Sequence, residues 1–300
     1  MRLALVANPK SGTAPEPEHL ARLLSGDGAE VSITPIQEIK AREEGGLDAE
    51  GLAAARQALS EGGRPDRIVV AGGDGSIGLA ALMAAEMGVA LAVVAVGTAN
   101  DFARALNLPM KLEEACALAR DPNAPTRHAE LALAGERPFV NAAATGLSVI
   151  AAREAKPHKS RLGPLAYAVG AIKAAVTATP LRCSVRCGDE QTYDGSAWQV
   201  VVGATGAFGG GSEIGGTSAH DGLLDVAVVP AGSRLGLARR AWGMRAGRLV
   251  RQSDVTHGQA ATIDVDVEDA KARFNVDGEV CRCDPAHFTL RPGGFEVVVA

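Results

Sequence analysis

The fold of this chain is decided by the stretch IVVAGGDGSI, residues 68–77. Its apolar first half predicts a strand buried on both faces, and the residues after the glycines predict the start of a helix. Glycines permit a sharp turn and let the backbone approach a ligand closely. The unpaired N–H groups and the positive dipole end of the helix would then point at that ligand, which favours a phosphate. Asp74 would either orient a magnesium ion through water or simply cap the helix, and the simpler alternative is a tight turn without a ligand.

A second junction of the same kind follows one βα unit later, in VGTANDFA, residues 96–103. Here Thr98 is the predicted N-cap, with Asn100 and Asp101 in the first turn, although plain capping would also explain these residues. A third loop, NPKSGT at residues 8–13, follows the first predicted strand. Loops at the carboxyl ends of adjacent parallel strands form the usual ligand crevice. The glycine patterns of P-loop ATPases and of dinucleotide-binding dehydrogenases are absent from these loops, which excludes both classes.

Strands and helices alternate through the first part of the chain. The alternation predicts a mainly parallel, doubly wound α/β domain with right-handed crossovers. The expected strands are 3–8, 29–36, 67–71 and 89–96. A first helix is expected to end at about residue 24, and further helices are expected at 49–59, 76–87, 100–106 and 111–120.

Strands dominate after the turn-rich stretch DPNAP, residues 121–125. They predict an antiparallel β-sandwich domain with helical insertions. The expected strands are 128–133, 138–144, 181–187, 198–204, 223–229, 261–267, 273–276 and 287–290, and the expected helices are 164–178 and 235–249. We expect a first domain over residues 1–124 and a second over 125–290, with the apolar strand at 295–300 returning to the first domain.

Composition narrows the function further. The chain has 300 residues, 47% of them hydrophobic, and a net charge of −5, which argues against a dedicated nucleic-acid binder. No stretch reaches the ~18 apolar residues of a membrane span, and the start does not read as a signal peptide, so we expect a cytoplasmic protein. The arginines between 234 and 251 indicate either a solvated helix face or contact with anionic headgroups at the inner membrane face. The five cysteines are expected to be ordinary thiols rather than zinc ligands or disulfides.

The loops, taken in order, resemble the diacylglycerol kinase catalytic-domain family, and in particular its bacterial YegS-like branch, related to sphingosine and ceramide kinases. The matching segments cover nearly the whole chain; they are NPKSG at 8–12, GGDGS at 72–76, GTANDFA at 97–103, FVN at 139–141, DGLLD at 221–225 and DGE at 277–279. The resemblance implies an ATP-binding α/β domain, a larger β-rich domain, a cleft between them, and magnesium-assisted phosphoryl transfer to a lipid alcohol.

The resemblance also implies roles for individual residues. Three residues are implied as catalytic, namely Asp74, Asp277 and Glu279. The implied nucleotide-binding residues are Asn8, Pro9, Lys10, Ser11, Gly12, Thr34, Gly72, Gly73, Asp74, Gly75, Ser76, Gly97, Thr98, Asn100 and Asp101. Ser218, Asp221 and the Leu223 carbonyl would hold magnesium. Without the resemblance, the Asp-Gly pairs at 221 and 277 would indicate turns.

Two other functions stay open from the sequence. An NAD kinase shares the Gly-Gly-Asp-Gly turn, although the 97–103 segment favours the lipid branch. A nucleotide-binding regulatory module without an acceptor site is the non-enzymatic alternative. The sequence leaves the acceptor lipid and the oligomeric state open, a homodimer being one possibility.

Overall fold

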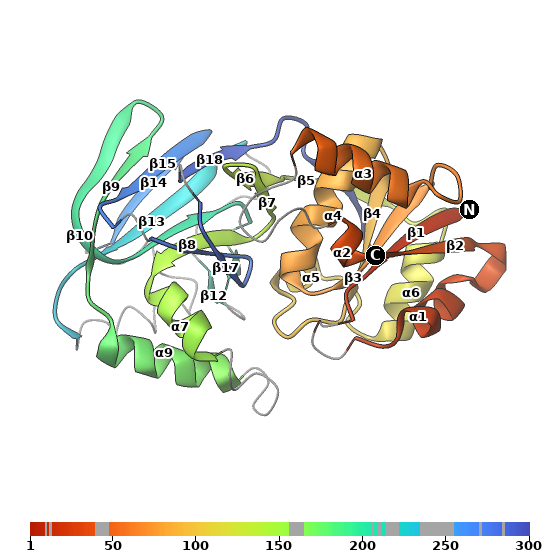
Figure 1. Ribbon diagram of the computed structural model, residues 1–300, viewed down its shortest axis with the longest axis horizontal. Helices are drawn as coiled ribbons and strands as arrows, with labels where there is room; N and C mark the ends of the chain where they lie inside the picture. Colours follow the sequence, from red (N-terminus) through yellow and green to blue (C-terminus); the bar gives the residue numbers. More distant parts are fainter. Residues whose placement is uncertain are drawn as a thin grey trace. The chain divides into compact units, whose positions relative to one another are not determined.

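The computed structural model describes residues 1–9, 11, 14–39, 48–155, 165–205, 207–208, 212–213, 222–234, 255–269, 272–283 and 286–300. The chain forms two compact units. The N-terminal unit comprises Met1–Leu131, Glu136–Pro138 and Arg291–Ala300, and the C-terminal unit comprises Ala132–Gly135 and Phe139–Leu290. Figure 1 labels the elements of both.

The N-terminal unit is built on a six-stranded sheet with the order β2-β1-β3-β4-β19-β5. The pairs among its first five strands are parallel, and β5 runs antiparallel to β19 at the edge. The strands are β1 Arg2–Ala7, β2 Glu30–Pro35, β3 Arg67–Gly72, β4 Ala90–Ala95, β5 Thr126–Ala129 and β19 Phe295–Val298. The helices are α1 Pro17–Leu24, the 3₁₀ turn η1 Gly26–Gly28, α2 Ile36–Ile39, α3 Ala49–Leu59, α4 Asp74–Met87, α5 Asp101–Ala105 and α6 Leu112–Arg120. The predicted α/β class of this part is confirmed.

Helices cover both faces of this sheet. Apolar residues of β1, β3 and β4 pack in one cluster with Leu20 and Leu24 of α1 and with Cys116 of α6. Figure 1 shows α1 and α6 on one side of the sheet and α3 and α4 on the other. Because β3 is buried on both faces, its residues 68–71 are all apolar, without alternation. Gly88 ends α4 in the left-handed conformation, with φ 60°.

The C-terminal unit contains a large, mostly antiparallel sheet. Its main path has the order β17-β16-β8-β10-β9-β15-β18-β6-β7, and β13 pairs with both β10 and β14. The strands are β6 Ala132–Ala134, β7 Arg137–Phe139, β8 Ala142–Gly146, β9 Leu181–Cys187, β10 Glu190–Gly203, β13 Leu224–Pro230, β14 Thr256–Ala260, β15 Thr262–Val267, β16 Phe274–Val276, β17 Glu279–Cys281 and β18 His287–Leu290, with a separate pair β11 Ala207–Phe208 and β12 Ser212–Glu213. The predicted antiparallel β-rich class is also confirmed.

Two apolar clusters pack on opposite faces of the strands in this unit. Val226 and Val228 of β13 belong to a large core with Phe139, Phe274 and Phe288. The alternate residues of β13 belong to a second cluster, with Trp198 and partners that include residues of α7 Leu147–Ala155. Figure 1 shows α7 lying beside α9, Leu165–Thr177. This period-two alternation is what a strand between two packed layers requires.

Several element boundaries differ from expectation. The expected strand 128–133 is two strands, because β5 lies in the N-terminal sheet and β6 in the C-terminal one. The expected strand 138–144 is interrupted between β7 and β8. The first half of β10, together with β14, β17 and α7, was not anticipated. The helix expected at 235–249 lies outside the described residues.

Candidate functional site

In the N-terminal unit, two glycine turns touch backbone to backbone. They follow β3 and β4, which are neighbours in the sheet. A Cβ added at Gly97 would lie 2.4 Å from the Cα of Gly73, and one added at Gly72 would lie 2.8 Å from the Cβ of Ser76. No side chain fits at these positions without moving the backbone. The sequence therefore has glycine where two strand ends converge, which leaves their main-chain amides close together.

Asp74 ties these two turns to each other. It is the first residue of α4, and its carboxylate accepts hydrogen bonds from the backbone N–H groups of Asp101 (3.2 Å) and Phe102 (3.0 Å), at the start of α5. Asp74 thus caps α5, a different helix from the one it begins.

Asn100 shapes the turn between β4 and α5. It is the N-cap of α5, in the left-handed conformation with φ 55°. Its side-chain amide closes on Gly97, accepting from Gly97 N (2.9 Å) and donating to Gly97 O (3.1 Å). The predicted N-cap, Thr98, lies earlier in the turn and is half-buried. The Thr98 assignment was wrong because Asn tolerates the left-handed conformation that this cap requires.

The loop after β1 reaches the same place. Asn8 Nδ2 donates to Ser76 Oγ over 3.0 Å, and Asn8 N donates to Ala71 O over 3.1 Å. Pro9 follows, and Ser11 N donates back to Asn8 O over 3.0 Å. A Cβ added at Gly73 would lie 3.3 Å from Ser11 Oγ. Lys10 and Gly12 lie outside the described residues.

The structure therefore brings most of the predicted nucleotide-binding residues together at the carboxyl ends of β1, β3 and β4. Gly75 lies in the first turn of α4 and belongs to this group. Thr34 is not part of this group, because it lies within β2, where it pairs with Val6, and is only 2% exposed. We call the group the strand-end cluster; it consists of Asn8, Ser11, Gly72–Ser76 and Gly97–Phe102.

In the C-terminal unit, Asp277 occupies the turn between β16 and β17. Val276 pairs with Glu279, so the connection is a two-residue hairpin turn of Asp277 (φ 46°) and Gly278 (φ 87°). Asp-Gly is a preferred pair for such a turn because both residues need positive φ. The turn predicted from the Asp-Gly pair is present.

The carboxylate of Asp277 binds a distant segment of the chain. It accepts hydrogen bonds from the backbone N–H groups of Val140 (2.8 Å), Asn141 (3.1 Å) and Ala142 (3.0 Å). Val140 and Asn141 form the break between β7 and β8, and Ala142 is the first residue of β8. The DGE and FVN segments of the sequence are thus one structural feature.

The predicted metal site is described only in part. Ser218 and Asp221 lie outside the described residues, whereas Leu223 immediately precedes β13. Gly203 of β10 pairs with both Ala142 and Asp225. The residues just before β13 therefore lie at the same end of these strands as the Asp277 turn. Within the described part of the chain, no three or more His, Cys, Asp or Glu side chains are grouped to hold a metal.

One buried acid was not given a role from the sequence. Asp225 has 0% exposure, and its Oδ1 lies 2.7 Å from Nε2 of His257, while its Oδ2 is buried without a hydrogen-bond partner. The contact between Asp225 and His257 depends on the register of β13 with β14. The sequence of β14 has no apolar pattern from which this strand could have been predicted.

The described cysteines are spread over several elements. Burial raises the pKa of Cys116 and of Cys183 to about 11 in each case. Cys281 and Cys283 lie near each other, with their sulfur atoms 3.7 Å apart. The strands of Cys183 and Cys281 are not neighbours, because β16, β8 and β10 lie between β9 and β17.

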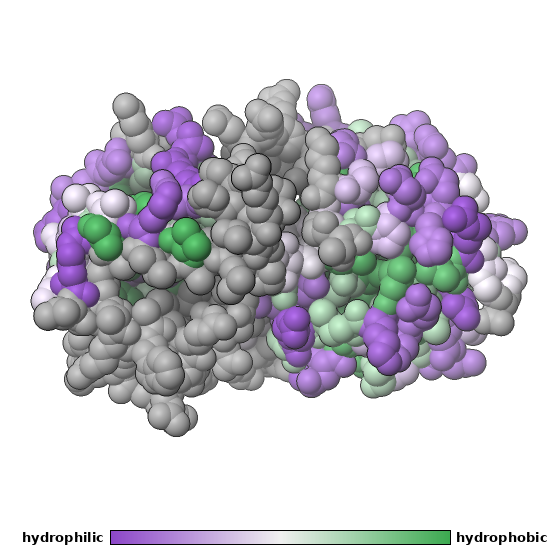
Figure 2. All heavy atoms as spheres, turned by 90° about the horizontal axis from the view of Figure 1, so that it is seen from below, coloured by the Kyte–Doolittle hydropathy of each residue, from purple (hydrophilic) through white to green (hydrophobic). Residues whose placement is uncertain are grey.

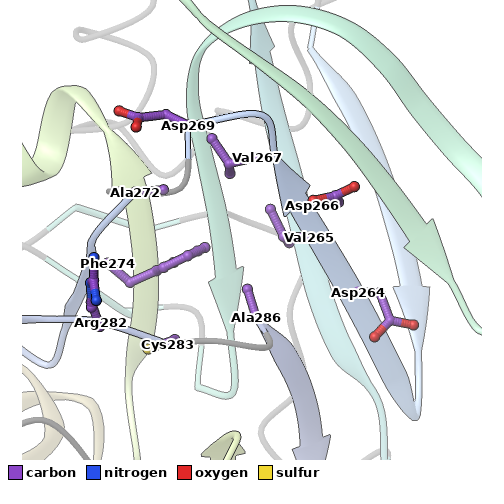
Figure 3. Close-up of a pocket in the computed structure, with 10 residues that line it drawn as sticks. All are labelled: Asp264, Val265, Asp266, Val267, Asp269, Ala272, Phe274, Arg282, Cys283 and Ala286. Carbon is purple, nitrogen blue, oxygen red and sulfur yellow. The ribbon is translucent and has the colours of Figure 1, made fainter.

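A pocket of about 270 Å³ lies elsewhere in the C-terminal unit. Figure 3 shows Val265 and Phe274 directed into it, with Arg282 at its side. None of the predicted site residues is among the described residues that line it.

Membrane-related features are few in the described residues. No helix there is both long and apolar enough to cross a bilayer. Figure 2 shows mostly hydrophilic side chains on the visible surface of the N-terminal unit, with a smaller hydrophobic area among them. Of the predicted arginine group, Arg234 is described; its guanidinium lies 5.4 Å from the ring centre of Trp198 and donates to Ala178 O. Most of the group lies outside the described residues.

Comparisons with known proteins agree with this architecture. Residues 2–130 match the diacylglycerol kinase catalytic domain, and residues 141–299 match the YegS C-terminal NAD kinase beta sandwich-like domain. A relative from Pseudomonas fluorescens, named "Probable lipid kinase YegS-like", is 29% identical over 77% of this chain and 76% of its own length. "Probable lipid kinase YegS" of Salmonella typhimurium is 28% identical over 77% of each chain.

A solved structure shares the fold over the whole chain. It is a crystal structure of a diacylglycerol kinase from Bacillus anthracis, with a TM-score of 0.74 and 23% identity over 100% of this chain and 97% of that one. Together with the two domain matches, this similarity extends from the first strand to the last. The chain therefore belongs to the YegS-like branch of the diacylglycerol kinase catalytic-domain family and is a kinase.

Proposed function

We propose that this kinase transfers the γ-phosphoryl group of ATP to a hydroxyl of a diacylglycerol-like lipid, with the assistance of magnesium. The observation that carries the proposal is the strand-end cluster, in which the loops after β1, β3 and β4 converge. The YegS-like relatives, named as probable lipid kinases, support a lipid as acceptor.

The strand-end cluster suits the anionic part of ATP. The touching glycines of the two turns leave main-chain amides without side chains to cover them, which favours close approach of phosphate oxygens. The start of α4 adds its dipole and its N-terminal N–H groups. Phosphoryl transfer needs mainly positioning and charge stabilisation, which such a cluster supplies.

The donor set proposed for magnesium consists of hard oxygen atoms. Ser218 offers a hydroxyl, Asp221 a carboxylate and Leu223 a carbonyl, and magnesium prefers a few such ligands completed by water. In the N-terminal unit, two backbone N–H bonds fix the Asp74 carboxylate at the cluster, where it would orient a magnesium ion through water. When bound, the metal would neutralise charge on the phosphates.

The other residues of the chain would hold and orient the reactants. In this proposal the nucleotide is oriented by Asn8, Ser11, Ser76 and Thr98. The β16–β17 hairpin supplies the catalytic carboxylates, Asp277 and Glu279, that act on the lipid hydroxyl. Because the acceptor resides in a bilayer, the protein would contact a membrane surface at least transiently.

The test is phosphate transfer from γ-labelled ATP, with magnesium, to vesicles that contain a panel of lipid alcohols. We expect label in the lipid extract with wild type, and a loss of at least ~100-fold with Asp74→Asn, because the capping of α5 and the carboxylate charge are lost together. Asp48→Asn is the matched control, since Asp48 only caps α3 and asparagine also caps well. Label on NAD instead of lipid would show an NAD kinase, and ATP binding without transfer would show a regulatory module.

A further inference from the structure

Two cysteine side chains of the C-terminal unit lie in contact. Cys281 is the last residue of β17, Cys283 follows it by two positions, and their Sγ atoms are 3.7 Å apart. Both are thiols in the structure. The other cysteines are placed differently, since Cys183 and Cys187 lie four positions apart on β9 and Cys116 lies on α6 of the N-terminal unit. A disulfide between Cys281 and Cys283 needs the two sulfur atoms to approach by a further ~1.7 Å.

The backbone permits this approach. Two residues of extended chain span at most ~7 Å, which keeps the Cα atoms of Cys281 and Cys283 close to the ~4.4–6.8 Å separation found across disulfides. Cys281 pairs with Phe274 as the last pair of the β16–β17 ladder, and Cys283 lies beyond that pair. The strand pairing therefore holds Cys281 but does not fix the position of Cys283.

The two thiols differ in how accessible they are. Cys281 is 3% exposed and packs in the core with Phe274 and Phe288. Cys283 is half-buried and lines the pocket of about 270 Å³, next to Arg282 (Figure 3). A small oxidant that enters this pocket would reach Cys283, with the buried thiol of Cys281 beside it. An accessible cysteine next to a second, resolving cysteine is the arrangement typical of redox-sensing sites.

We propose that Cys281 and Cys283 form a hydroperoxide-sensitive dithiol site, in which Cys283 is oxidised first and Cys281 closes a reversible disulfide. The Cys283 thiolate attacks one oxygen of the hydroperoxide, the O–O bond breaks, and the other oxygen leaves with the electron pair and takes up a proton. The Cys281 thiolate then attacks the sulfenic acid sulfur of Cys283. The S–S bond forms, the S–O bond breaks, and the hydroxide that leaves becomes water. The hydroperoxide is reduced by two electrons, one from each sulfur.

The disulfide would affect the kinase through the β16–β17 hairpin. Only three residue pairs join the two strands, from Phe274 with Cys281 at one end to the pair beside the Asp277 turn at the other. A ring that spans three residues pulls Cys281 toward Cys283 and away from its packing on Phe274. Such a small ring is strained, and strained disulfides are readily reduced, which makes the modification reversible. The effect on phosphate transfer rests on the proposed function, whereas formation of the bond does not.

Peptide mapping shows whether the bond forms. Trypsin cuts after Arg282, between the two cysteines, so the reduced protein releases residues 274–282 and 283–300 as separate peptides. Wild type is treated with hydrogen peroxide, the remaining thiols are blocked, and the protein is digested. We expect these two segments to stay joined by a bond that costs two hydrogens in mass, and to separate after treatment with dithiothreitol.

Cysteine variants link the bond to activity. Phosphate transfer to vesicles is measured before peroxide, after peroxide and after dithiothreitol in wild type, Cys281→Ala, Cys283→Ala and Cys187→Ala. Cys187→Ala is the matched control, because Cys187 is half-buried like Cys283 but burial raises its pKa, which leaves less of the reactive thiolate. Thermal unfolding of the same samples shows whether each variant is folded, and Cys283→Ala carries the test alone if the buried Cys281→Ala is not.

We expect peroxide to lower transfer by at least ~10-fold in wild type and in Cys187→Ala, because a displaced hairpin misplaces the reacting groups. Dithiothreitol should restore both. Transfer by Cys281→Ala and Cys283→Ala should be the same before and after peroxide, except for slow losses that dithiothreitol does not reverse.

Several outcomes would overturn the proposal. Separate peptides after peroxide, or a bond from Cys283 to Cys183 or Cys187, would show that the dithiol site does not form. Reversible peroxide sensitivity in Cys283→Ala would place the cause at another residue, and joined peptides with undiminished transfer would disprove the effect on the hairpin. If untreated wild type phosphorylates no lipid of the panel, the proposed function fails, and the peptide map still decides whether the dithiol site exists.

Discussion

Glycine at positions 73 and 97 determines how closely the ends of β3 and β4 approach each other. A Cβ added at either position would meet the main chain of the other turn. The capping bonds of Asp74 and Asn100 then hold the two turns in this arrangement. At the residue scale, the candidate nucleotide site is thus shaped by glycines, which have no side chain, and by the capping side chains of Asp74 and Asn100.

Gly97→Ala should lower both stability and nucleotide affinity. Its Cβ would come within 2.4 Å of Gly73 Cα, so one of the two turns must move. We expect a loss of about 1–3 kcal/mol in unfolding free energy, seen in denaturant titration, and at least ~10-fold weaker ATP binding by calorimetry. Gly62→Ala is the control, because its nearest neighbour would be an ordinary 3.9 Å away. Equal ATP affinity in both variants would contradict this reading of the turns.

At the element scale, the β16–β17 hairpin couples a local turn to a segment 136 residues away, since Asp277 binds Asn141 N. Its geometry depends on Gly278, whose φ is 87°. The β9–β10 hairpin has a glycine with positive φ as well, Gly188, but a Cβ added there would have nothing within 4 Å. The two hairpins therefore make a natural pair for comparison.

Gly278→Ala and Gly188→Ala should both destabilise the protein by about 1 kcal/mol, because each forces alanine into positive φ. Only Gly278→Ala should also reduce phosphate transfer, since it moves Asp277 off the Val140–Ala142 amides. Parallel unfolding and transfer assays check this. A similar loss of transfer in both variants would mean that the effect is general destabilisation.

Sequence reasoning succeeded where burial gives a strong local signal. The buried parallel strands β1, β3 and β4 were predicted within a few residues because each has a continuous apolar run, and α3 was predicted at its exact bounds. It failed for His128–Leu133, where the chain passes from one sheet to the other without any change in apolar pattern. The exposed, polar first half of β10 likewise carries no strand signal.

The candidate site shows the same limit. The glycine turns can be recognised from the local sequence, and because they follow parallel strands, their convergence could be predicted. The bonds of Asp277 to Val140–Ala142, and the pairing of Asp225 with His257, join residues far apart in sequence. Such contacts depend on sheet register, which the sequence alone does not reveal.

At the scale of the whole molecule, the last strand completes the first unit. β19 lies between β4 and β5 in the N-terminal sheet, although it is the final element of the chain. Its Phe295 is 3% exposed and stacks on Phe102 of α5, with ring centres 6.1 Å apart. The C-terminus thus supports the helix that Asp74 caps.

Phe295→Ala should therefore destabilise the N-terminal unit by about 3–5 kcal/mol, the usual cost of such a cavity. Hydrogen exchange should increase in β4 and α5, and ATP binding should weaken. Phe288→Ala is the matched variant, because Phe288 is fully buried in the C-terminal unit. If Phe288→Ala loosened β4 and α5 as much as Phe295→Ala does, the support of α5 by β19 would be disproved.

The most direct measurement of the central claim is hydrogen exchange by mass spectrometry, with and without ATP and magnesium. If the strand-end cluster binds the nucleotide's phosphates, exchange should slow by at least ~10-fold in peptides covering residues 72–78 and 97–103, and stay unchanged in β9 and β15. Unchanged exchange in both segments at saturating ATP, or protection confined to other parts of the chain, would contradict the account.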